Sequence, residues 1–220
     1  MPINLDQGPD FLTDRILPGD AQREPAEPGI LQGSLVSLIP IEEHHREGLY
    51  RVLQRPEIWQ DTWLNVPSGA ELERSFDDML ARRADRSRLP FVIEDRRTGA
   101  VLGTTSIGDI DAFHRNAEIG WTFLSPDYWR TGVNTECKYL LLRYGFERMD
   151  TIRIQLSVSS LNLRSQQAVE RIGAVREGVF RRHRIEPGGL VHDNIFYSIL
   201  DTEWPSVRQR LLGLMAKKYE

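Results

Sequence analysis

A strand, a short turn with one glycine and an amphipathic helix follow one another over residues 117–149. Apolar residues alternate along residues 117–124, which is the pattern of a strand with one buried face. A helix is expected over residues 134–149, with an apolar stripe formed by Cys137, Leu140, Leu141 and Tyr144. Residues 152–158 then alternate again, so a second strand follows the helix directly. This unit makes a sheet covered by helices the expected plan.

The other segments extend that plan. Strands are expected at residues 35–39, 91–93 and 101–107, and helices at residues 42–54, 69–80 and 162–172. Pro187-Gly188-Gly189 marks a final hairpin, and a terminal helix is expected over residues 202–217. We therefore predict an α+β (mixed α/β) fold with one central sheet, without the strict strand–helix alternation of a doubly wound fold.

The chain of 220 residues suits one domain with an arm. Residues 1–33 are rich in proline and glycine and have few apolar neighbours, so we interpret them as a partly irregular arm, and residues 34–220 as the domain. Apolar residues of the arm, such as Phe11 and Ile16, are suited to contact the body or a second subunit. The arm and the terminal helix are therefore compatible with a homodimer.

Composition narrows the class of protein. With 28 Lys and Arg against 32 Asp and Glu, the formal charge is −4, which argues against a general nucleic-acid binder. The single cysteine, Cys137, excludes an intrachain disulfide and fits a reducing cytoplasm. No run of 18 apolar residues is present, and the N-terminus lacks the pattern of a signal peptide. We expect a cytoplasmic protein that does not associate with a membrane.

The turn at residues 128–136 has the features of an anion site. Gly132 can adopt a positive φ and let a ligand approach the backbone, while the first amides of the following helix lack internal partners. The helix dipole favours negative charge there, and Arg130 adds a forked cation. The alternative is an ordinary connection capped by Asn134 or Thr135. The Walker lysine–serine pattern and the three glycines of a dinucleotide fingerprint are both missing.

This turn resembles the pyrophosphate-binding motif of the GCN5-related N-acetyltransferase (GNAT) superfamily, Arg/Gln-x-x-Gly-x-Gly/Ala. The chain is similar to its branch of RimJ/RimL-type ribosomal-protein N-terminal acetyltransferases over about residues 34–204. Five further segments carry the resemblance: residues 117–121, 144–147, 162–165, 171–174 and 176–178. Asn134 takes the place of the motif's last small residue, and no tyrosine occupies the helix position that serves as general acid in many members.

The resemblance implies a mostly antiparallel, splayed sheet of about seven strands and acetyl transfer from acetyl-CoA to a primary amine, with no metal. Residues in matching positions would contact the cofactor: Arg130, Thr131, Gly132, Val133, Asn134 and Thr135 at the turn, Thr122, Phe123 and Leu124 on the strand, and Asn162 and Ser165 on the later helix. The alternative for Asn162 is a plain helix cap, and for Ser165 a local backbone hydrogen bond.

The resemblance also suggests roles in chemistry. Glu118 is the candidate general base, with Asp109 and Asp111 competing for that role, and each could instead be structural. Ser165 is the candidate acid for the leaving thiolate. Trp59 and Trp63 lie where members of the superfamily border the acceptor pocket, although core packing is an equal alternative. The acceptor would be a protein N-terminus or a small-molecule amine. A non-catalytic acyl-CoA sensor on the same fold stays open as a second function.

Overall fold

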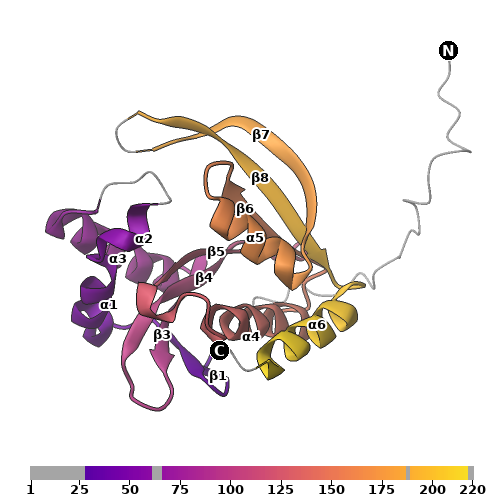
Figure 1. The fold of residues 1–220 in the computed structure, drawn as a ribbon, viewed down its shortest axis with the longest axis horizontal. Helices are drawn as coiled ribbons and strands as arrows, with labels where there is room; N and C mark the ends of the chain where they lie inside the picture. Colours follow the sequence, from indigo (N-terminus) through magenta and orange to yellow (C-terminus); the bar gives the residue numbers. More distant parts are fainter. Residues whose placement is uncertain (1–27, 61–65, 187–188, 218–220) are drawn as a thin grey trace, which may run out of the picture.

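The computed structural model describes residues 28–60, 66–186 and 189–217, so Trp63 and most of the predicted arm lie outside the described residues. Within these ranges the chain forms a single open sheet with helices on both faces (Figure 1). The strands are β1 (Leu31–Gln32), β2 (Val36–Pro40), β3 (Arg88–Asp95), β4 (Val101–Asp111), β5 (Asn116–Leu124), β6 (Arg153–Ser159), β7 (Val175–Ile185) and β8 (Val191–Leu200). The helices are α1 (Arg46–Leu53), α2 (Pro56–Gln60), α3 (Gly69–Ala84), α4 (Val133–Glu147), α5 (Leu163–Ile172) and α6 (Trp204–Ala216), with short 3-10 turns at Glu43–His45 and Pro126–Tyr128.

The sheet has eight strands in the order β1-β2-β3-β4-β5-β6-β8-β7. All neighbouring pairs are antiparallel except β5 and β6, which are parallel and are joined by the crossover helix α4. The prediction of a mixed, mostly antiparallel sheet is confirmed. The eighth strand is β1, which lies in the segment interpreted as the arm and pairs with β2.

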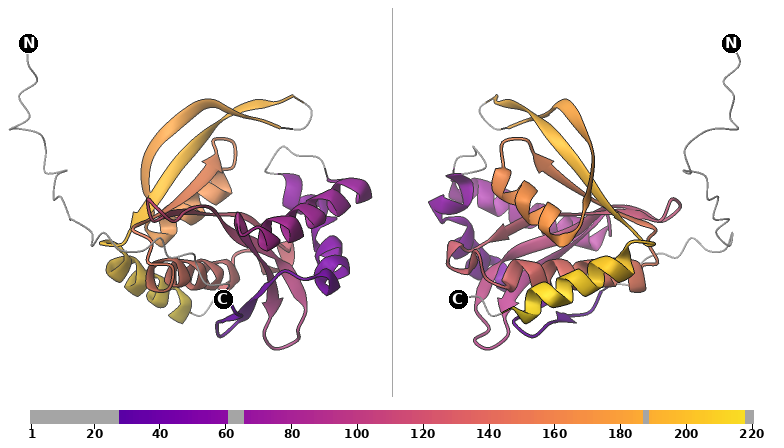
Figure 2. Two further views of the ribbon diagram at one scale, coloured as in Figure 1. Left: turned by 180° about the vertical axis from the view of Figure 1, so that it is seen from behind. Right: turned by 45° about the vertical axis from the view of Figure 1, so that its right-hand side comes forward.

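Side chains on the two faces of the sheet belong to two hydrophobic cores. Phe91 and Ile93 of β3 belong to the larger core with α4, α5 and α6, whereas the intervening Val92 belongs to the smaller core with α1, α2 and α3. This division follows from the period of two along a strand, which directs successive side chains to opposite faces. Figure 2 shows α1–α3 and the pair α4 and α6 separated by the sheet.

Helix α4 is buried on most of its circumference. Its fully or nearly buried residues include Glu136 and Lys138 as well as the predicted apolar stripe. The buried surface of α4 is therefore wider than the single apolar stripe expected from the sequence, because the sheet covers one side of the helix while α6 packs against another. Buried charged groups need specific partners.

The carboxylate of Glu136 has such partners. It accepts hydrogen bonds from the amides of Ser34, Leu35 and Val36 at 2.7, 2.7 and 2.8 Å, and from Ser34 Oγ at 2.6 Å. Since Glu136 lies in the first turn of α4, these bonds fix the start of that helix against the turn before β2.

Helix boundaries follow local sequence signals. Ser68 caps α3 and forms a reciprocal capping box with Glu71, and Gly173 ends α5 with φ of 105°. The helix predicted over residues 42–54 is divided into a 3-10 turn and α1, and the residues after it form the short helix α2.

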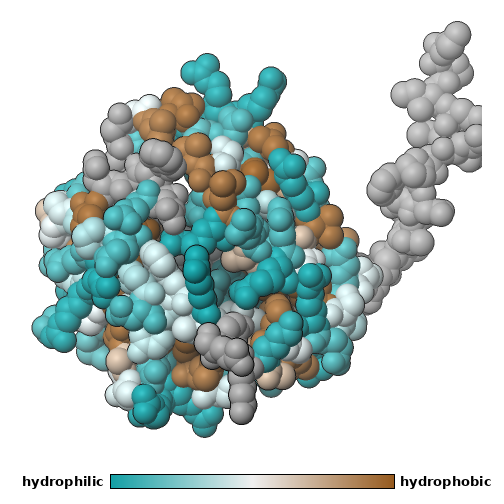
Figure 3. All heavy atoms as spheres, viewed as in Figure 1, coloured by the Kyte–Doolittle hydropathy of each residue, from teal (hydrophilic) through white to brown (hydrophobic). Residues whose placement is uncertain are grey.

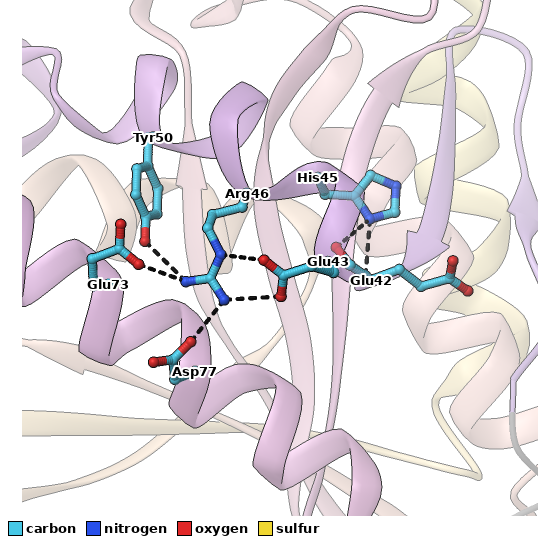
Figure 4. A network of polar contacts seen from close by, with 7 residues as sticks. All are labelled: Glu42, Glu43, His45, Arg46, Tyr50, Glu73 and Asp77. Atoms are coloured by element: carbon cyan, nitrogen blue, oxygen red, sulfur yellow. Dashed lines mark hydrogen bonds and ion pairs between the residues drawn. The ribbon is translucent and has the colours of Figure 1, made fainter.

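Arg46 joins α1 to α3 (Figure 4). Its guanidinium donates to Glu43 at 2.6 Å, to Glu73 at 2.8 Å and to Asp77 at 2.7 Å. The Tyr50 hydroxyl accepts a further bond at 3.2 Å. These contacts hold α1 and α3 together on their face of the sheet. Among the described residues, no helix is long and apolar enough to cross a membrane.

Candidate active site

Strands β5 and β6 pair at only three positions and then diverge. The pairs are Asn116 with Arg153, Ala117 with Ile154 and Glu118 with Gln155. Both strands are described in full, and beyond Glu118 neither pairs with the other, although β5 runs on to Leu124 and β6 to Ser159. The divergence leaves backbone amides and carbonyls on the facing edges of both strands available to a ligand.

Glu118 lies at the point of divergence and is 7% exposed. Its Oε1 accepts a hydrogen bond from Ser157 Oγ at 2.6 Å, and its Oε2 accepts one from Gln155 Nε2 at 2.7 Å. The side chain therefore points to the face of the sheet away from α4, since the neighbouring Ala117 and Ile119 belong to the α4 core. A carboxylate held there by two neutral donors can accept a proton from an amine.

The turn before α4 has a different backbone from the one expected. Gly132 is the residue that precedes the helix and has φ of −69°, whereas the positive φ of 59° falls on Arg130. The positive φ expected at Gly132 is therefore wrong. Gly132 is buried, so its small size, not its φ, suits the turn. Arg130 is exposed, and its left-handed backbone is uncommon for a residue with a side chain.

The first turn of α4 presents amides without a side-chain cap. Thr131 Oγ1 accepts from the Val133 amide at 3.3 Å and donates to the Tyr128 carbonyl at 2.6 Å, so its hydroxyl braces the turn. The alternative caps Asn134 and Thr135 do not act as such. Asn134 Oδ1 is buried and lacks a hydrogen-bond partner among the described residues. An amide with buried, unused capacity beside free helix amides fits a phosphate ligand, since turning the amide would present its Nδ2 as a donor.

Two arginines of α5 lie against this turn, and sequence reasoning missed both. Arg171 Nη2 donates to Thr135 Oγ1 at 3.2 Å, so the hydroxyl of Thr135 is engaged and its amide is the group left for a ligand. The Arg164 guanidinium lies 3.8 Å from the centre of the Trp129 ring. The signal for both is the helical spacing of seven residues between them, which places them on one side of α5. They add positive charge around the amides of α4.

Asn162 and Ser165 occupy the first turn of α5. Asn162 Oδ1 accepts from the Ser165 amide at 2.9 Å, so Asn162 is the helix cap that was considered as the alternative. Its Nδ2 and the partly buried Ser165 hydroxyl remain candidates for contact with a ligand.

The outer part of β5 contains Thr122, Phe123 and Leu124. A bulge precedes it, because Gly120 pairs with Ser106 and Phe123 with Thr104, and Trp121 has φ of 50°. Phe123 packs on Trp59 with ring centroids 5.0 Å apart. Trp59 is 8% exposed and donates its Nε1 hydrogen to the Leu53 carbonyl at 2.7 Å, so it is a core residue behind the strand.

Lys138 approaches β5 from the α4 side. It is 7% exposed, and its Nζ donates to Thr122 Oγ1 at 2.9 Å. Thr122 Oγ1 in turn lies 2.7 Å from Thr105 Oγ1. Burial lowers the pKa of the Lys138 ammonium to about 8, against the opposing effects of Cys137 and Glu118. Sequence reasoning missed this residue because a lone lysine in a helix is ordinarily solvated.

The competing acids and the other candidate groups lie elsewhere. Asp111 is exposed and accepts from the His114 amide at 2.8 Å in the turn between β4 and β5, and Asp109 is exposed with φ of 45°. Cys137 is fully buried, which raises the pKa of its thiol to about 12 and makes it a core residue, as expected. Among the described residues, no group of histidine, cysteine or acidic side chains is arranged to bind a metal.

The β7–β8 hairpin extends from the sheet toward the side of α2 and α3 (Figures 1 and 2). It carries exposed apolar side chains, seen as brown spheres among teal ones at the top of Figure 3. They are Val179, Phe180, Ile185, Leu190 and Val191. Arg181, Arg182 and Arg184 are exposed beside them, so the hairpin is both apolar and basic.

Comparison with known proteins agrees with this geometry. Residues 36–175 match the model of the acetyltransferase (GNAT) domain. YdaF of Bacillus subtilis, whose name assigns it provisionally to the ribosomal N-acetyltransferases, is 31% identical over 106 residues, which cover 48% of this chain and 57% of YdaF. The chain thus matches little more than half of that relative's length.

Solved structures share the fold over most of the chain. A GCN5-related N-acetyltransferase from Brucella melitensis is 27% identical with a TM-score of 0.77, covering 89% of this chain and 91% of that one. RimJ of Mycobacterium smegmatis, solved in complex with CoA-disulfide, is 22% identical with a TM-score of 0.70, covering 84% and 91%. The match at residues 36–175 spans the diverging strands and the turn before α4, and the chain therefore belongs to the GNAT acetyltransferase family.

Proposed function

We propose that this protein transfers the acetyl group of acetyl-CoA to a primary amine, with Glu118 as the general base. The observation that carries the proposal is the position of Glu118, a buried carboxylate held by two neutral donors where β5 and β6 diverge. Because its hydrogen-bond donors Ser157 and Gln155 are neutral, the Glu118 carboxylate can accept a proton from an ammonium group.

Acetyl-CoA would be held from both ends. Its pyrophosphate would bind the amides of Gly132, Asn134 and Thr135 and the side chain of Asn134, with Arg130 and the α5 arginines supplying charge. Its pantetheine arm would extend along the unpaired edge of β5 at Thr122, Phe123 and Leu124, with Asn162 on the opposite side. In this arrangement the thioester would lie near the point of divergence, beside Glu118.

The reaction then needs three proton and bond changes. Glu118 takes a proton from the acceptor ammonium, the free amine attacks the thioester carbonyl, and the carbon–sulfur bond breaks. A backbone amide of the outer β5 segment would stabilise the developing oxyanion. Ser165 would donate a proton to the leaving thiolate and regain one through water, as the nitrogen loses its second proton to that water, so that a neutral amide and a neutral thiol are released.

The acceptor we propose is the α-amine of a protein, with a small-molecule amine as the alternative. The apolar and basic β7–β8 hairpin favours an acceptor that extends beyond its amine, and the naming of YdaF as a ribosomal enzyme points the same way. Trp59 would act indirectly, by supporting Phe123. A homodimer remains a prediction that light scattering in solution would check.

The test is Glu118→Gln, which keeps the size of the side chain and its contacts with Ser157 and Gln155. We expect kcat to fall by about 10²–10³, while the Kd for acetyl-CoA measured by calorimetry stays unchanged. Glu47→Gln, at an exposed pair on α1, is the matched control. Unchanged turnover would remove Glu118 from the mechanism. Tight acetyl-CoA binding without turnover on any peptide or small amine would favour the non-catalytic sensor.

A further inference from the structure

A row of polar side chains leads away from Glu118 on the sheet face opposite α4. On β6, Gln155, Ser157 and Ser159 alternate with residues of the α4 core, so they share the face of Glu118. The antiparallel register places Asn194 of β8 opposite Ser159. His192, two residues before Asn194, lies on the same face and is 7% exposed.

The far end of this row is a hydroxyl, an imidazole and a carboxylate in sequence. Ser159 Oγ lies 3.0 Å from His192 Nδ1, and His192 Nε2 lies 2.5 Å from Glu186 Oε1. Ser159 Oγ already accepts from the Leu161 amide at 3.2 Å, so its own hydrogen is free to be donated to Nδ1. In that tautomer His192 carries its hydrogen on Nε2 and donates it to Glu186.

Other contacts at His192 are consistent with this direction. The Asp193 carbonyl is 3.0 Å from Nδ1 and can only accept, so it takes up a hydrogen bond from Nδ1 once the relayed proton arrives there, beside the bond that it accepts from the Ser160 amide at 2.9 Å. The charged groups around the ring are Glu186, Asp193 and, in register across β7, Arg184. The Glu186 side chain is 23% exposed, so the row ends at solvent.

The near end of the row joins Glu118 through Ser157 at 2.6 Å. Between Ser157 and Ser159 the distance is that of alternate residues on a strand, about 6.6 Å, which two hydrogen-bonded waters can bridge. Asn194 Oδ1, opposite Ser159, is a buried acceptor with no partner among the described residues. A polar atom of this kind is where a bridging water finds one of its hydrogen bonds.

We propose that His192 and Glu186 form the outlet through which the proton taken up by Glu118 reaches solvent. This inference rests on the proposed function, because it requires Glu118 to accept the proton of the ammonium group. The proton passes to Ser157, whose hydroxyl hydrogen moves through the two waters to Ser159. The Ser159 hydrogen then goes to His192 Nδ1, and the Nε2 hydrogen leaves through Glu186. Only O–H and N–H bonds change, and Glu118 returns to its ionised form.

His192 acts here through Ser159 and does not touch the substrate. The decisive variant is therefore His192→Ala, assayed with and without imidazole buffer. We expect kcat to fall about tenfold and to recover as imidazole is raised, because a small base can take the proton in place of the side chain. KM for acetyl-CoA should not change. His183→Ala, on the same hairpin and in contact with Phe180 and Phe196, is the matched control and should respond to neither.

A second variant keeps the test independent of folding. Glu186→Gln leaves His192 in place and should lower kcat with an unchanged KM for acetyl-CoA, because a neutral amide can accept the Nε2 hydrogen bond but cannot take up its proton. Full activity of both variants in an active wild-type enzyme, or a loss in His192→Ala that imidazole does not restore, would overturn the outlet. Absence of wild-type turnover on every amine would instead overturn the proposed function.

Discussion

Replacing Lys138 by methionine should stabilise the protein at neutral pH. The side chains have similar length, but methionine has no charge to bury. Lys138 is 7% exposed and its Nζ has one hydrogen bond, to Thr122. The folded state therefore holds a cation in a place where water is nearly absent.

The magnitude follows from the pKa. Burial lowers the pKa of Lys138 from 10.5 to about 8, which corresponds to about 3 kcal/mol of unfavourable free energy at pH 7. The variant also loses the bond to Thr122, at about 1 kcal/mol, although Thr122 keeps Thr105 as a partner. The expected net gain in the free energy of unfolding is about 2 kcal/mol.

The stabilisation gained from Lys138→Met should depend on pH. Between about pH 8 and 10.5 the unfolded chain holds a proton on this lysine and the folded protein does not, so the free energy of unfolding of the wild type rises with pH. The penalty is fully present below pH 8. The advantage of the variant should therefore shrink steadily from pH 8 and vanish near pH 10.5.

Urea unfolding followed by tryptophan fluorescence at pH 7, 8.5 and 10 measures this difference. Lys217→Met, at the exposed end of α6, is the control and should have no effect at any of these pH values. A variant less stable than the wild type at pH 7, or a difference that does not change with pH, would refute the assignment of Lys138 as a buried, destabilising cation.

Three further substitutions test the start of α4. Glu136→Gln should lower the free energy of unfolding by about 3 kcal/mol in urea titrations, because the NH2 of the new amide would face backbone N–H donors. Ser34→Ala removes a single bond to the carboxylate and should lower the free energy of unfolding by only about 1 kcal/mol. Equal losses in the two variants would contradict a carboxylate that accepts several bonds at once. Asn134→Ala should weaken acetyl-CoA binding by about tenfold in calorimetry, because a hydrogen bond to a charged phosphate is lost. The melting temperature should stay unchanged. An unaltered Kd would remove Asn134 from the pyrophosphate site.

Several strands and helix boundaries could be predicted because their signals are local. Period-two alternation at residues 152–158, the cap at Ser68 and Gly173 after α5 all act within a few residues. The length of the helix expected over residues 42–54 could not be predicted, because its division into a 3-10 turn and α1 depends on how Arg46 is held by α3.

The contacts of the candidate site residues depend on how elements far apart in the sequence pack together. Glu118 could be selected as a base from its place in the strand, but its donors Ser157 and Gln155 follow from the register of β6. Arg171 reaches Thr135 only because α5 packs beside α4. Cap and motif patterns contain no information on such contacts between elements.

The parallel pair of β5 and β6 explains why the site lies where it does. A parallel pair needs a crossover, and α4 supplies it, so the amides at the start of α4 follow the outer end of β5. The bulge at Trp121 turns β5 away from β6 just past Glu118. One interruption of the sheet thus opens an edge for an extended ligand, places a helix terminus at its outer end and leaves a carboxylate at its inner end. A substitution that restored pairing past Glu118 would remove all three features together, even with each of their residues retained.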